Sequence, residues 1–427
     1  MGTGELKLND LLGTQGQVRG SKGLILTAEV PGARRGDWVR ILKRADTSVD
    51  AEVVAFEGDL VSLMPLGDSR GIGAGDPVVW MGPALSVHAS VGGLLGRVVD
   101  GIGRPLDGLG PLEGDPWPLW RPSPPALSRP RIQQVLPTGV RALDALCTVG
   151  EGQRLAVFAP AGAGKTSLIA RLAQGCQVDA IVTCLIGERG RELNEFLEDA
   201  LDKRTRARSV VVCSTSDASA LERTKSAQLA TCIAEFLRDQ GMRVLLLMDS
   251  LTRLVRSARE VGLAAGEPPA RRGFPPSAFA ELAPLIERAG MSERGSITAF
   301  YTVLVEGNDL DEPVADEVRG LVDGHIVLDR ALSQRGHYPS IDVVKSLSRS
   351  MDSLVSPPHR EAARRLRGWL AHFEHKRELF ELGAVQPGSD RVLDQVLTRL
   401  PAIHALLCQG PREVTPFGDT LDRLFAL

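Results

Sequence analysis

The sequence lacks the features that mark secreted, membrane-spanning or disulfide-bonded chains. Its six cysteines are scattered through 427 residues without a Cys-x-x-Cys pair, which argues against a disulfide framework or a zinc site and fits a reducing compartment. No apolar run approaches the ~20 residues that span a bilayer. Residues 1–13 contain no basic stretch followed by an apolar run, so we expect no signal peptide. These absences favour a cytoplasmic protein.

The chain also lacks an excess of charge of one sign. Its net charge is −3, so there is no overall basic field to hold nucleic acid, although a local basic patch is not excluded by this sum. Hydrophobic residues make up 43% of the chain, which argues against wholesale disorder. The length corresponds to about two to three domains of ~150 residues each.

Short strands are expected in the N-terminal part. From about Gln17 to Met81, runs rich in Val, Ile and Leu alternate with Gly, Asp and Pro, a pattern typical of a small β-barrel or sandwich. The following segment, Gly96–Pro130, is dense in Gly and Pro. We expect it to be an extended connector packed on a domain surface, with a flexible linker as the alternative.

Strands and helices alternate from about Arg154 to Asp329. The strands are short apolar runs with few polar interruptions, which suits strands buried on both faces of a parallel sheet. The segments between them have helical spacing, and the helix that begins near residue 220 is expected to stop at Gly241. The pattern predicts a doubly wound α/β core.

The chain is expected to be helical from Pro357 and Pro358 to its end. Between residues 360 and 381, one apolar stripe is predicted, with charged residues around it. That charge is typical of a solvated helix face and less so of a nucleic-acid surface. The predicted stripe consists of Leu366, Leu370, Phe373 and Phe380.

A phosphate-binding loop is predicted between an expected strand and an expected helix, in the sequence PAGAGKTSLIARL. Small residues let backbone N–H groups surround phosphates, and the helix dipole adds to the attraction. Lys165 would reach the β- and γ-phosphates of ATP, and Thr166 would bind Mg²⁺. The usual pattern begins with glycine where this chain has Ala159, but a strand end keeps φ negative and should tolerate a methyl group. The predicted ATP-binding residues here are Ala161, Gly162, Ala163, Gly164, Lys165, Thr166 and Ser167.

Two acidic residues follow other predicted strands. Asp249 ends the apolar run VLLLM, the usual place for the aspartate that holds Mg²⁺, although such a residue can also be a cap or turn residue. Glu188 comes just past a strand expected at Asp179–Ile186, one helix and one strand after Lys165. A βαβ unit would place it at the same carboxyl edge of the sheet, where a carboxylate can polarise the attacking water. Arg189 is then placed to contact phosphates; a solvated helix start is the alternative for this charged run.

Four further motifs carry a family resemblance. They are GERGREL (187–193), DSLTRLVRSARE (249–260), GLAAGEPPARRGFPPS (262–277) and DGHIVLDRALSQRGHYPSIDV (323–343). Together, in this order, they resemble the ATPases of type III secretion systems and of flagellar export, which are relatives of the rotary F-type ATP synthase subunits. The resemblance runs from about Gly13 to the C-terminus. Ala159 and the stretch Thr215–Ala230 depart from the family pattern, neither at a catalytic position.

The resemblance implies a fold in three parts. The centre would be an α/β P-loop NTPase core with a RecA-like parallel sheet, preceded by an N-terminal β-barrel and followed by a C-terminal helical domain. We place these domains at residues 86–355, 1–85 and 356–427.

The resemblance also implies a homohexameric ring with ATP sites between subunits. Arg349, in SLSRSM, matches the arginine that completes a neighbour's site, where a guanidinium offsets charge on the transferred phosphoryl group. Tyr338 matches the aromatic residue that stacks on adenine. Without the resemblance, Arg349 would be read as a salt-bridge arginine and Tyr338 as a core residue. Gly262–Ser277 resembles the loop that faces the ring centre, and is otherwise a plain surface loop.

The expected function is Mg²⁺-dependent ATP hydrolysis that energises protein export through a type III secretion apparatus and releases cargo from chaperones. Lys165, Glu188 and Arg349 are the expected catalytic residues, and Thr166 and Asp249 the expected metal ligands. The ring would lie in the cytoplasm, peripheral to the inner membrane. The implied partners are further copies of the chain, a stator protein, a central coiled-coil stalk protein, the export gate and chaperone–cargo complexes, without nucleic acid.

Other functions remain open on the sequence. A rotary ion-translocating ATP synthase subunit would share nearly every motif, but the runs at 249–254 and 262–277 count against it. A flagellar export ATPase is less favoured because the tail before the barrel is short. An RNA translocase needs aromatic stacking platforms and a basic groove, whereas the part through Pro83 has only Trp38, Phe56 and Trp80. A non-hydrolysing ring subunit is disfavoured by intact Lys165, Glu188 and Asp249.

Overall fold

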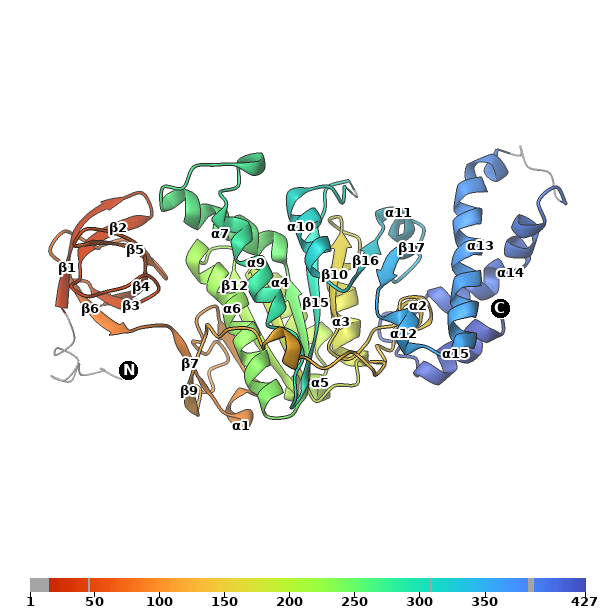
Figure 1. Cartoon of the computed structure of the whole chain (residues 1–427), viewed down its shortest axis with the longest axis horizontal. Helices are drawn as coiled ribbons and strands as arrows, with labels where there is room; N and C mark the ends of the chain where they lie inside the picture. Colours follow the sequence, from red (N-terminus) through yellow and green to blue (C-terminus); the bar gives the residue numbers. More distant parts are fainter. Residues whose placement is uncertain (1–14, 45–46, 308, 383–387) are drawn as a thin grey trace.

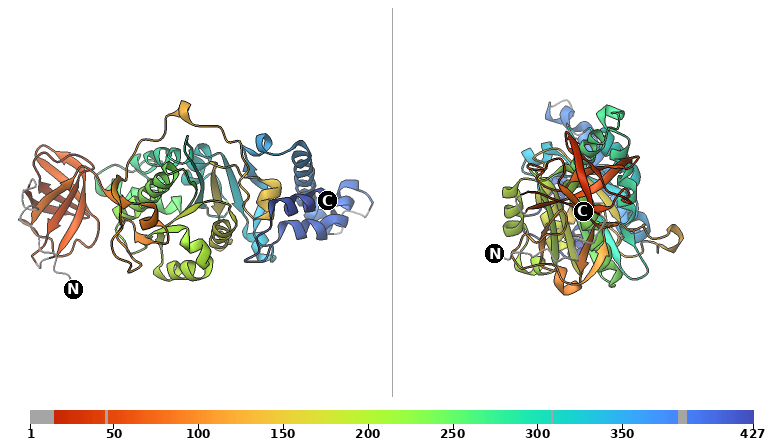
Figure 2. Two further views of the ribbon diagram at one scale, coloured as in Figure 1. Left: turned by 90° about the horizontal axis from the view of Figure 1, so that it is seen from below. Right: turned by 90° about the vertical axis from the view of Figure 1, so that its left-hand side faces the viewer.

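The computed structural model describes residues 15–44, 47–307, 309–382 and 388–427. The molecule is elongated, with three parts in a row (Figures 1 and 2). A barrel of strands lies at one end, a sheet covered by helices occupies the middle, and a group of helices forms the other end.

The N-terminal part is a closed barrel with strand order β1-β2-β5-β4-β3-β6, which decides between the predicted barrel and sandwich. Alternate residues of its longest strand, such as Val49, Ala51 and Val53, point into the barrel core. β1 has no apolar run, and it pairs closely with β2 because Gly16 has no Cβ; a Cβ there would lie 2.0 Å from the Glu29 carbonyl oxygen. The strands are β1 (Gln15–Lys22), β2 (Ile25–Glu29), β3 (Trp38–Leu42), β4 (Ser48–Glu57), β5 (Leu60–Pro65) and β6 (Pro77–Gly82).

The central part is built on one large sheet with the order β17-β16-β10-β15-β13-β11-β12-β8. All neighbours in this order are parallel except β16 and β17, which are antiparallel, and a short β14 pairs antiparallel with β15. The edge strand β8 comes from the segment predicted as a connector. The strands are β8 (Val98–Asp100), β10 (Arg154–Ala159), β11 (Ala180–Glu188), β12 (Ser209–Thr215), β13 (Arg243–Asp249), β14 (Gly290–Met291), β15 (Ser296–Leu304), β16 (Gly324–Leu328) and β17 (Ile341–Ser348).

Both faces of this sheet are covered, as the uninterrupted apolar runs predict. In β10, Ala156 and Phe158 pack into one core, whereas Leu155 and Val157 pack into the other. The first core lies under α6 (Ala220–Asp239), α7 (Leu251–Ala264), α9 (Leu282–Glu287) and α10 (Pro313–Leu321). The second lies under α2 (Arg141–Leu146) and α3 (Lys165–Gly175) and continues into the C-terminal helices.

The C-terminal part consists of α13 (Pro357–Glu381), α14 (Arg391–Leu407) and α15 (Phe417–Phe425). Leu366 is buried, and Leu370 and Phe373 pack against the same core. Phe380, the last residue of the predicted apolar stripe, is 37% exposed, because the last turn of α13 extends beyond the core. Within the described ranges, none of the helices combines the length and apolarity that a bilayer crossing requires.

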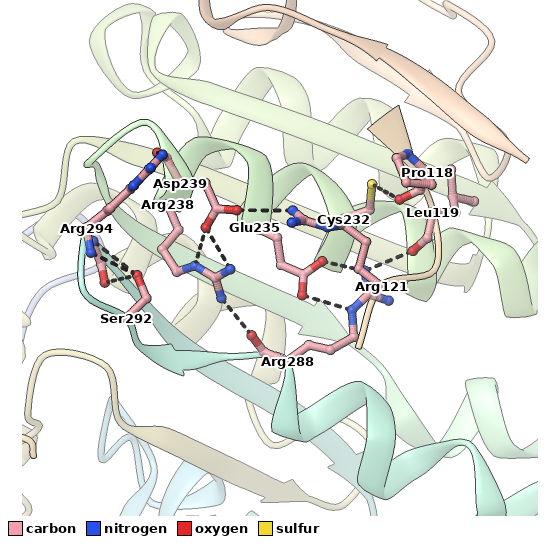
Figure 3. A network of polar contacts seen from close by, with 11 residues as sticks. Pro118, Leu119, Arg121, Cys232, Glu235, Arg238, Asp239, Arg288, Ser292 and Arg294 are labelled. Atoms are coloured by element: carbon pink, nitrogen blue, oxygen red, sulfur yellow. Dashed lines mark hydrogen bonds and ion pairs between the residues drawn. The ribbon is translucent and has the colours of Figure 1, made fainter. Parts of the chain in front are cut away.

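Part of the Gly/Pro-rich connector is packed on the surface of the central part, as predicted, and Figure 3 shows the contacts near Leu119, whereas residues 126–128 are exposed. Its Leu119 carbonyl accepts a hydrogen bond from Arg288 (2.9 Å), and Arg121 pairs with Asp239 at the end of α6 (3.1 Å). Arg288 also forms a bidentate pair with Glu235, and both side chains are almost fully buried. One buried arginine therefore joins the connector, α6 and the segment after α9.

Glu235→Ala should lower the free energy of unfolding by about 3–5 kcal/mol, because it leaves the Arg288 charge buried without its partner. Urea unfolding checks this. Glu195→Ala removes an exposed ion pair with Arg191 and should change stability by less than about 1 kcal/mol. The double variant Glu235→Met, Arg288→Met should recover most of the loss. Equal stabilities of Glu235→Ala and Glu195→Ala would contradict the role of this pair.

Candidate functional site

The candidate site lies where β10, β11 and β13 end at the carboxyl edge of the sheet. Lys165 follows β10 through the loop 160–164, Glu188 is the last residue of β11, and Asp249 is the last residue of β13. β10 and β11 are not neighbours, because β15 and β13 lie between them. The predicted proximity of Glu188 to the loop therefore depends on the long Lys165 side chain and not on adjacent strands.

The loop before α3 has the backbone that phosphate binding requires. Gly162 and Gly164 have φ values of 78° and 85°, which a residue with a Cβ rarely adopts. Gly164 is the N-cap of α3 and provides no side-chain acceptor, so the first N–H groups of the helix have no side-chain cap. Thr166 and Ser167 are exposed on the first turn, and Ala163 is buried. Within the described residues, Arg272 alone among non-glycines has positive φ, so Ala159 is unstrained, as predicted.

Lys165 lies between the two carboxylates. Its Nζ is 2.5 Å from Asp249 Oδ1 and 3.8 Å from Glu188 Oε1. Thr302 Oγ1 also donates a hydrogen bond to Asp249 Oδ1 (2.8 Å). These groups are mostly buried, so their charges interact in a medium of low dielectric constant. The geometry brings Lys165, Glu188 and Asp249 into one cluster.

The surroundings of Glu188 favour its protonated form. Burial raises its pKa, and a hydrogen bond to Glu192 and the negative charge of Asp249 raise it further, to about 7, against the opposing effects of Lys165 and Arg253. Glu192, on α4 (Gly190–Glu195), has a lowered pKa because of the same hydrogen bond. A carboxyl group that titrates near neutral pH is suited to proton transfer.

Three polar residues of this site were missed by the sequence analysis. Arg253 donates from Nη2 to Glu188 Oε2 (3.0 Å) and from Nη1 to the Gly187 carbonyl. It lies four residues after Asp249 on α7, and this helical spacing was the available signal. Thr302 lies inside an apolar strand and gave no signal. Ser340 Oγ donates to the Ala163 carbonyl and thereby holds the phosphate loop.

Tyr338 lies two residues before Ser340, whose side chain contacts the phosphate loop, in the segment between α11 (Arg330–Gln334) and β17. It is 48% exposed, which excludes the alternative of a core tyrosine. Arg189 is the N-cap residue of α4; its side chain is largely exposed and lies 3.9 Å from Glu192. The Tyr338 ring and the Arg189 guanidinium, both predicted to contact the nucleotide, are thus exposed to solvent.

Arg349 lies at the opposite edge of the sheet. It follows β17, which runs antiparallel to β16, and its N–H donates to the Asp323 carbonyl just before β16 begins. β17 has 8 residues, a length of roughly 25 Å. Arg349 is exposed. Its distance from the phosphate loop of its own chain therefore excludes it from the Lys165 cluster.

The donor set fits a hard divalent cation that is held mainly by substrate phosphates. Within the described residues, no group of three His, Cys, Asp or Glu side chains could hold a metal ion alone. Mg²⁺ usually takes one or two protein oxygen ligands together with phosphate and water oxygens. The exposed Thr166 hydroxyl and the Asp249 carboxylate would supply such ligands.

Comparison with known proteins identifies the family. Residues 139–348 match the nucleotide-binding domain of the ATP synthase alpha/beta family, and residues 355–426 match the C-terminal domain of the type III secretion ATPase EscN. The chain is 47% identical to the type 3 secretion system ATPase of Xanthomonas euvesicatoria over 98% of this chain and 92% of that protein. It is 41% identical to the flagellum-specific ATP synthase of Bacillus subtilis, over 99% and 97% of the two chains.

A solved structure supports the same assignment. The assembled ATPase EscN of the enteropathogenic E. coli type III secretion system matches with a TM-score of 0.90 and 41% identity, over 96% of this chain and 99% of that one. EscN has also been solved in complex with its central stalk EscO, with a TM-score of 0.89. A phosphate loop, two converging carboxylates and these similarities along nearly the whole chain lead to one conclusion. The chain belongs to the type 3 secretion system ATPases, whose nucleotide-binding domain is that of the ATP synthase alpha/beta family.

Proposed function

We propose that the chain hydrolyses Mg²⁺-ATP at the Lys165 cluster and that this reaction energises protein export. The observation that carries the proposal is the convergence of Lys165, Glu188 and Asp249 at one edge of the sheet. An ammonium, a metal-binding carboxylate and a carboxyl group of raised pKa are the groups that phosphoryl transfer to water requires.

In this proposal, each group has one task. The loop 161–164 and the start of α3 bind the phosphates through backbone N–H groups, and Lys165 neutralises β- and γ-phosphate charge. Thr166 and Asp249 would hold Mg²⁺, which would offset further phosphate charge. Glu188 orients the attacking water and accepts its proton, and Arg253 keeps the Glu188 carboxylate in place. Tyr338, whose ring is exposed, offers a stacking surface for the adenine base.

A pH profile of phosphate release tests this function. We expect kcat/KM for Mg²⁺-ATP to rise with pH and to level off above about 7, because a general base must be deprotonated and the pKa of Glu188 is raised to about 7. A flat profile from pH 5 to 9 would remove Glu188 as the base. Absence of ATP-dependent phosphate release at every pH would contradict the proposed function itself.

The same shift predicts a pH dependence of stability. The pKa of Glu188 is ordinarily 4.5 and is raised to about 7 in the folded chain. Between pH 4.5 and about 7, the folded state therefore binds more protons than the unfolded state. Ionisation of Glu188 therefore costs folding free energy as pH rises from 4.5 to about 7, and this cost is absent below 4.5. Glu188→Gln should be more stable than wild type at pH 8, with the difference vanishing near pH 4 in urea unfolding.

We further propose that the active form is a ring of identical subunits, a homohexamer, with each site shared by two neighbours. The exposed Arg349 lies too far from its own phosphate loop to act there, which supports a role in a neighbour's site. EscN, a relative with nearly the same chain length, has been solved as an assembled ATPase. A heterologous contact between copies closes into a ring when its rotation allows.

We infer partners and location from the relatives. The complex of EscN with its central stalk EscO supports a coiled-coil stalk as partner, with Gly262–Ser277 as the candidate contact loop. A stator protein, the export gate and chaperone–cargo complexes complete the expected set, at the cytoplasmic face of the inner membrane. Virulence-type secretion is favoured over flagellar export because the match at residues 355–426 is to the type III secretion domain.

A further inference from the structure

Arg141, the first residue of α2, connects the central part to the C-terminal helices. Its guanidinium is almost fully buried beside them, where Figure 1 shows α2 next to α13 and α15. Arg141 Nε donates to the Leu406 carbonyl (3.0 Å) and Nη1 donates to Thr415 Oγ1 (2.9 Å). The guanidinium also contacts the Glu413 carboxylate and the Cys408 carbonyl. One side chain thus holds residues 406–415, which we call the α14–α15 segment.

Gln409 carries this attachment to Tyr338. Its backbone N–H donates to the Tyr338 carbonyl (2.7 Å). Its side-chain Oε1 accepts from the Arg141 backbone N–H (2.7 Å), and its Nε2 donates to the Gly139 carbonyl (2.9 Å). Both polar atoms of the Gln409 side chain therefore bond to the backbone at the start of α2, and the Gln409 backbone in turn holds the Tyr338 backbone.

The close approach of the α14–α15 segment depends on a glycine in the same turn. Gly139 has a φ of 74°, and a Cβ there would lie 2.5 Å from the Val414 side chain. Arg171 on α3 adds a hydrogen bond to the Gln409 carbonyl (3.0 Å). The segment is thus seated on α2 and α3, the helix that begins at the phosphate loop.

We propose that Arg141 is a positioning residue for the nucleotide base, and that the seating of the C-terminal helices on α2 thereby sets the affinity for ATP. This rests on the proposed function, in which the exposed Tyr338 ring stacks on adenine. Tyr338 is joined to the phosphate loop on one side, through Ser340, and to the α14–α15 segment on the other, through Gln409. Because binding and positioning are linked reciprocally, ATP should in turn stabilise the α14–α15 segment.

Arg141→Lys tests the proposal, because lysine keeps the charge but cannot reproduce the fork of donors. We expect the KM and Kd for Mg²⁺-ATP to rise by about 10-fold while kcat changes by less than about 2-fold, since the reacting groups are untouched. The Kd for inorganic tripolyphosphate with Mg²⁺, measured by calorimetry, should stay unchanged because this ligand has no base. Hydrogen exchange of the 406–415 amides should slow on adding ATP to wild type and slow less in the variant.

Arg367→Lys is the matched control. Arg367 also joins the C-terminal helices to α2, through the Leu146 carbonyl (2.6 Å), but it does so at the other end of α2 and contacts no residue of the α14–α15 segment. The Arg367→Lys substitution should leave the Kd for Mg²⁺-ATP and the Kd for tripolyphosphate unchanged. If Arg141→Lys does not fold, Thr415→Val decides, because it removes the hydroxyl that Arg141 and Gln409 share while keeping the side-chain shape.

Three results would overturn the proposal: unchanged ATP affinity in Arg141→Lys or Thr415→Val, equal weakening of ATP and tripolyphosphate, or a fall in kcat at constant KM. These results are distinct from failure of the proposed function, because that failure would appear in the wild-type protein as absence of ATP hydrolysis.

Discussion

Glu188→Gln should lower ATP turnover by about 10²–10⁴-fold while ATP binding is retained. The amide has nearly the shape of the carboxyl group but cannot accept a proton, so the attacking water loses its base. The phosphate loop, Lys165 and Asp249 stay in place, and Lys165 loses only the longer of its two carboxylate contacts (3.8 Å). Phosphate release measures the turnover, and equilibrium titration of Mg²⁺-ATP measures binding.

Glu195→Gln is the matched control for this variant. Glu195 ends α4, two turns beyond Glu188, is exposed, and pairs with Arg191. Its substitution should leave turnover and binding unchanged. Normal turnover in Glu188→Gln would show that another group activates water, and a parallel loss of ATP binding would show that Glu188 holds the nucleotide instead.

Arg349→Ala should abolish most ATP turnover in the assembled protein, by about 10³-fold or more, as for arginines that offset charge in phosphoryl transfer. The isolated subunit should still bind ATP, because Arg349 lies at the sheet edge opposite its own phosphate loop. Arg364→Ala, which removes an exposed arginine of α13 that pairs with Glu361, should have no such effect.

Mixing two inactive variants distinguishes action within a chain from action between chains. Lys165→Ala lacks the phosphate-binding ammonium, and Arg349→Ala lacks the guanidinium. If each site combines Lys165 of one copy with Arg349 of the next, random co-assembly restores about one site in four. Turnover should then reappear on mixing and depend on protein concentration. Mixed assemblies without activity would contradict the shared site.

Glu188 and Arg349 are positioned by different features of the structure. Glu188 is placed by its own chain: β11 ends at the site, and Arg253 and Lys165 surround the carboxyl group. Arg349 is placed by β17, which reverses direction relative to β16 and takes the residue away from the site. The reversal puts Glu188, the proposed base, and Arg349, the proposed charge-stabilising group, at opposite edges of one sheet. In the proposed ring, each edge would supply one part of a shared site.

Much of the candidate site could be predicted because its signals are local. The phosphate loop is a strand end, a turn of small residues and a helix start within 13 consecutive residues, Pro160–Leu172, so backbone conformation alone defines it. Asp249 was identified in the same way, from its place at the end of an apolar strand. The resemblance of four short motifs predicted the family, which the comparisons confirm.

Contacts between distant segments were not predictable from such patterns. Thr302 gave no signal because one hydroxyl inside an apolar strand does not alter the strand pattern, yet it bonds Asp249. β8 was hidden in a Gly/Pro-rich segment because three residues are too few to establish a strand pattern. The exposure of Phe380 in the predicted apolar stripe was not foreseeable, because helical spacing does not show where the covering core ends.

The order of residues along the chain by itself determined the phosphate loop, the strands buried on both faces and the positions of the two acidic residues at strand ends, because each follows from local backbone preference and side-chain spacing. Only the tertiary structure decided that β15 and β13 separate β10 from β11, that burial beside Asp249 and Glu192 raises the pKa of Glu188, and that Arg349 lies at the far edge. Strand order and desolvation depend on which segments are in contact in the folded chain, and a local sequence pattern does not specify those contacts.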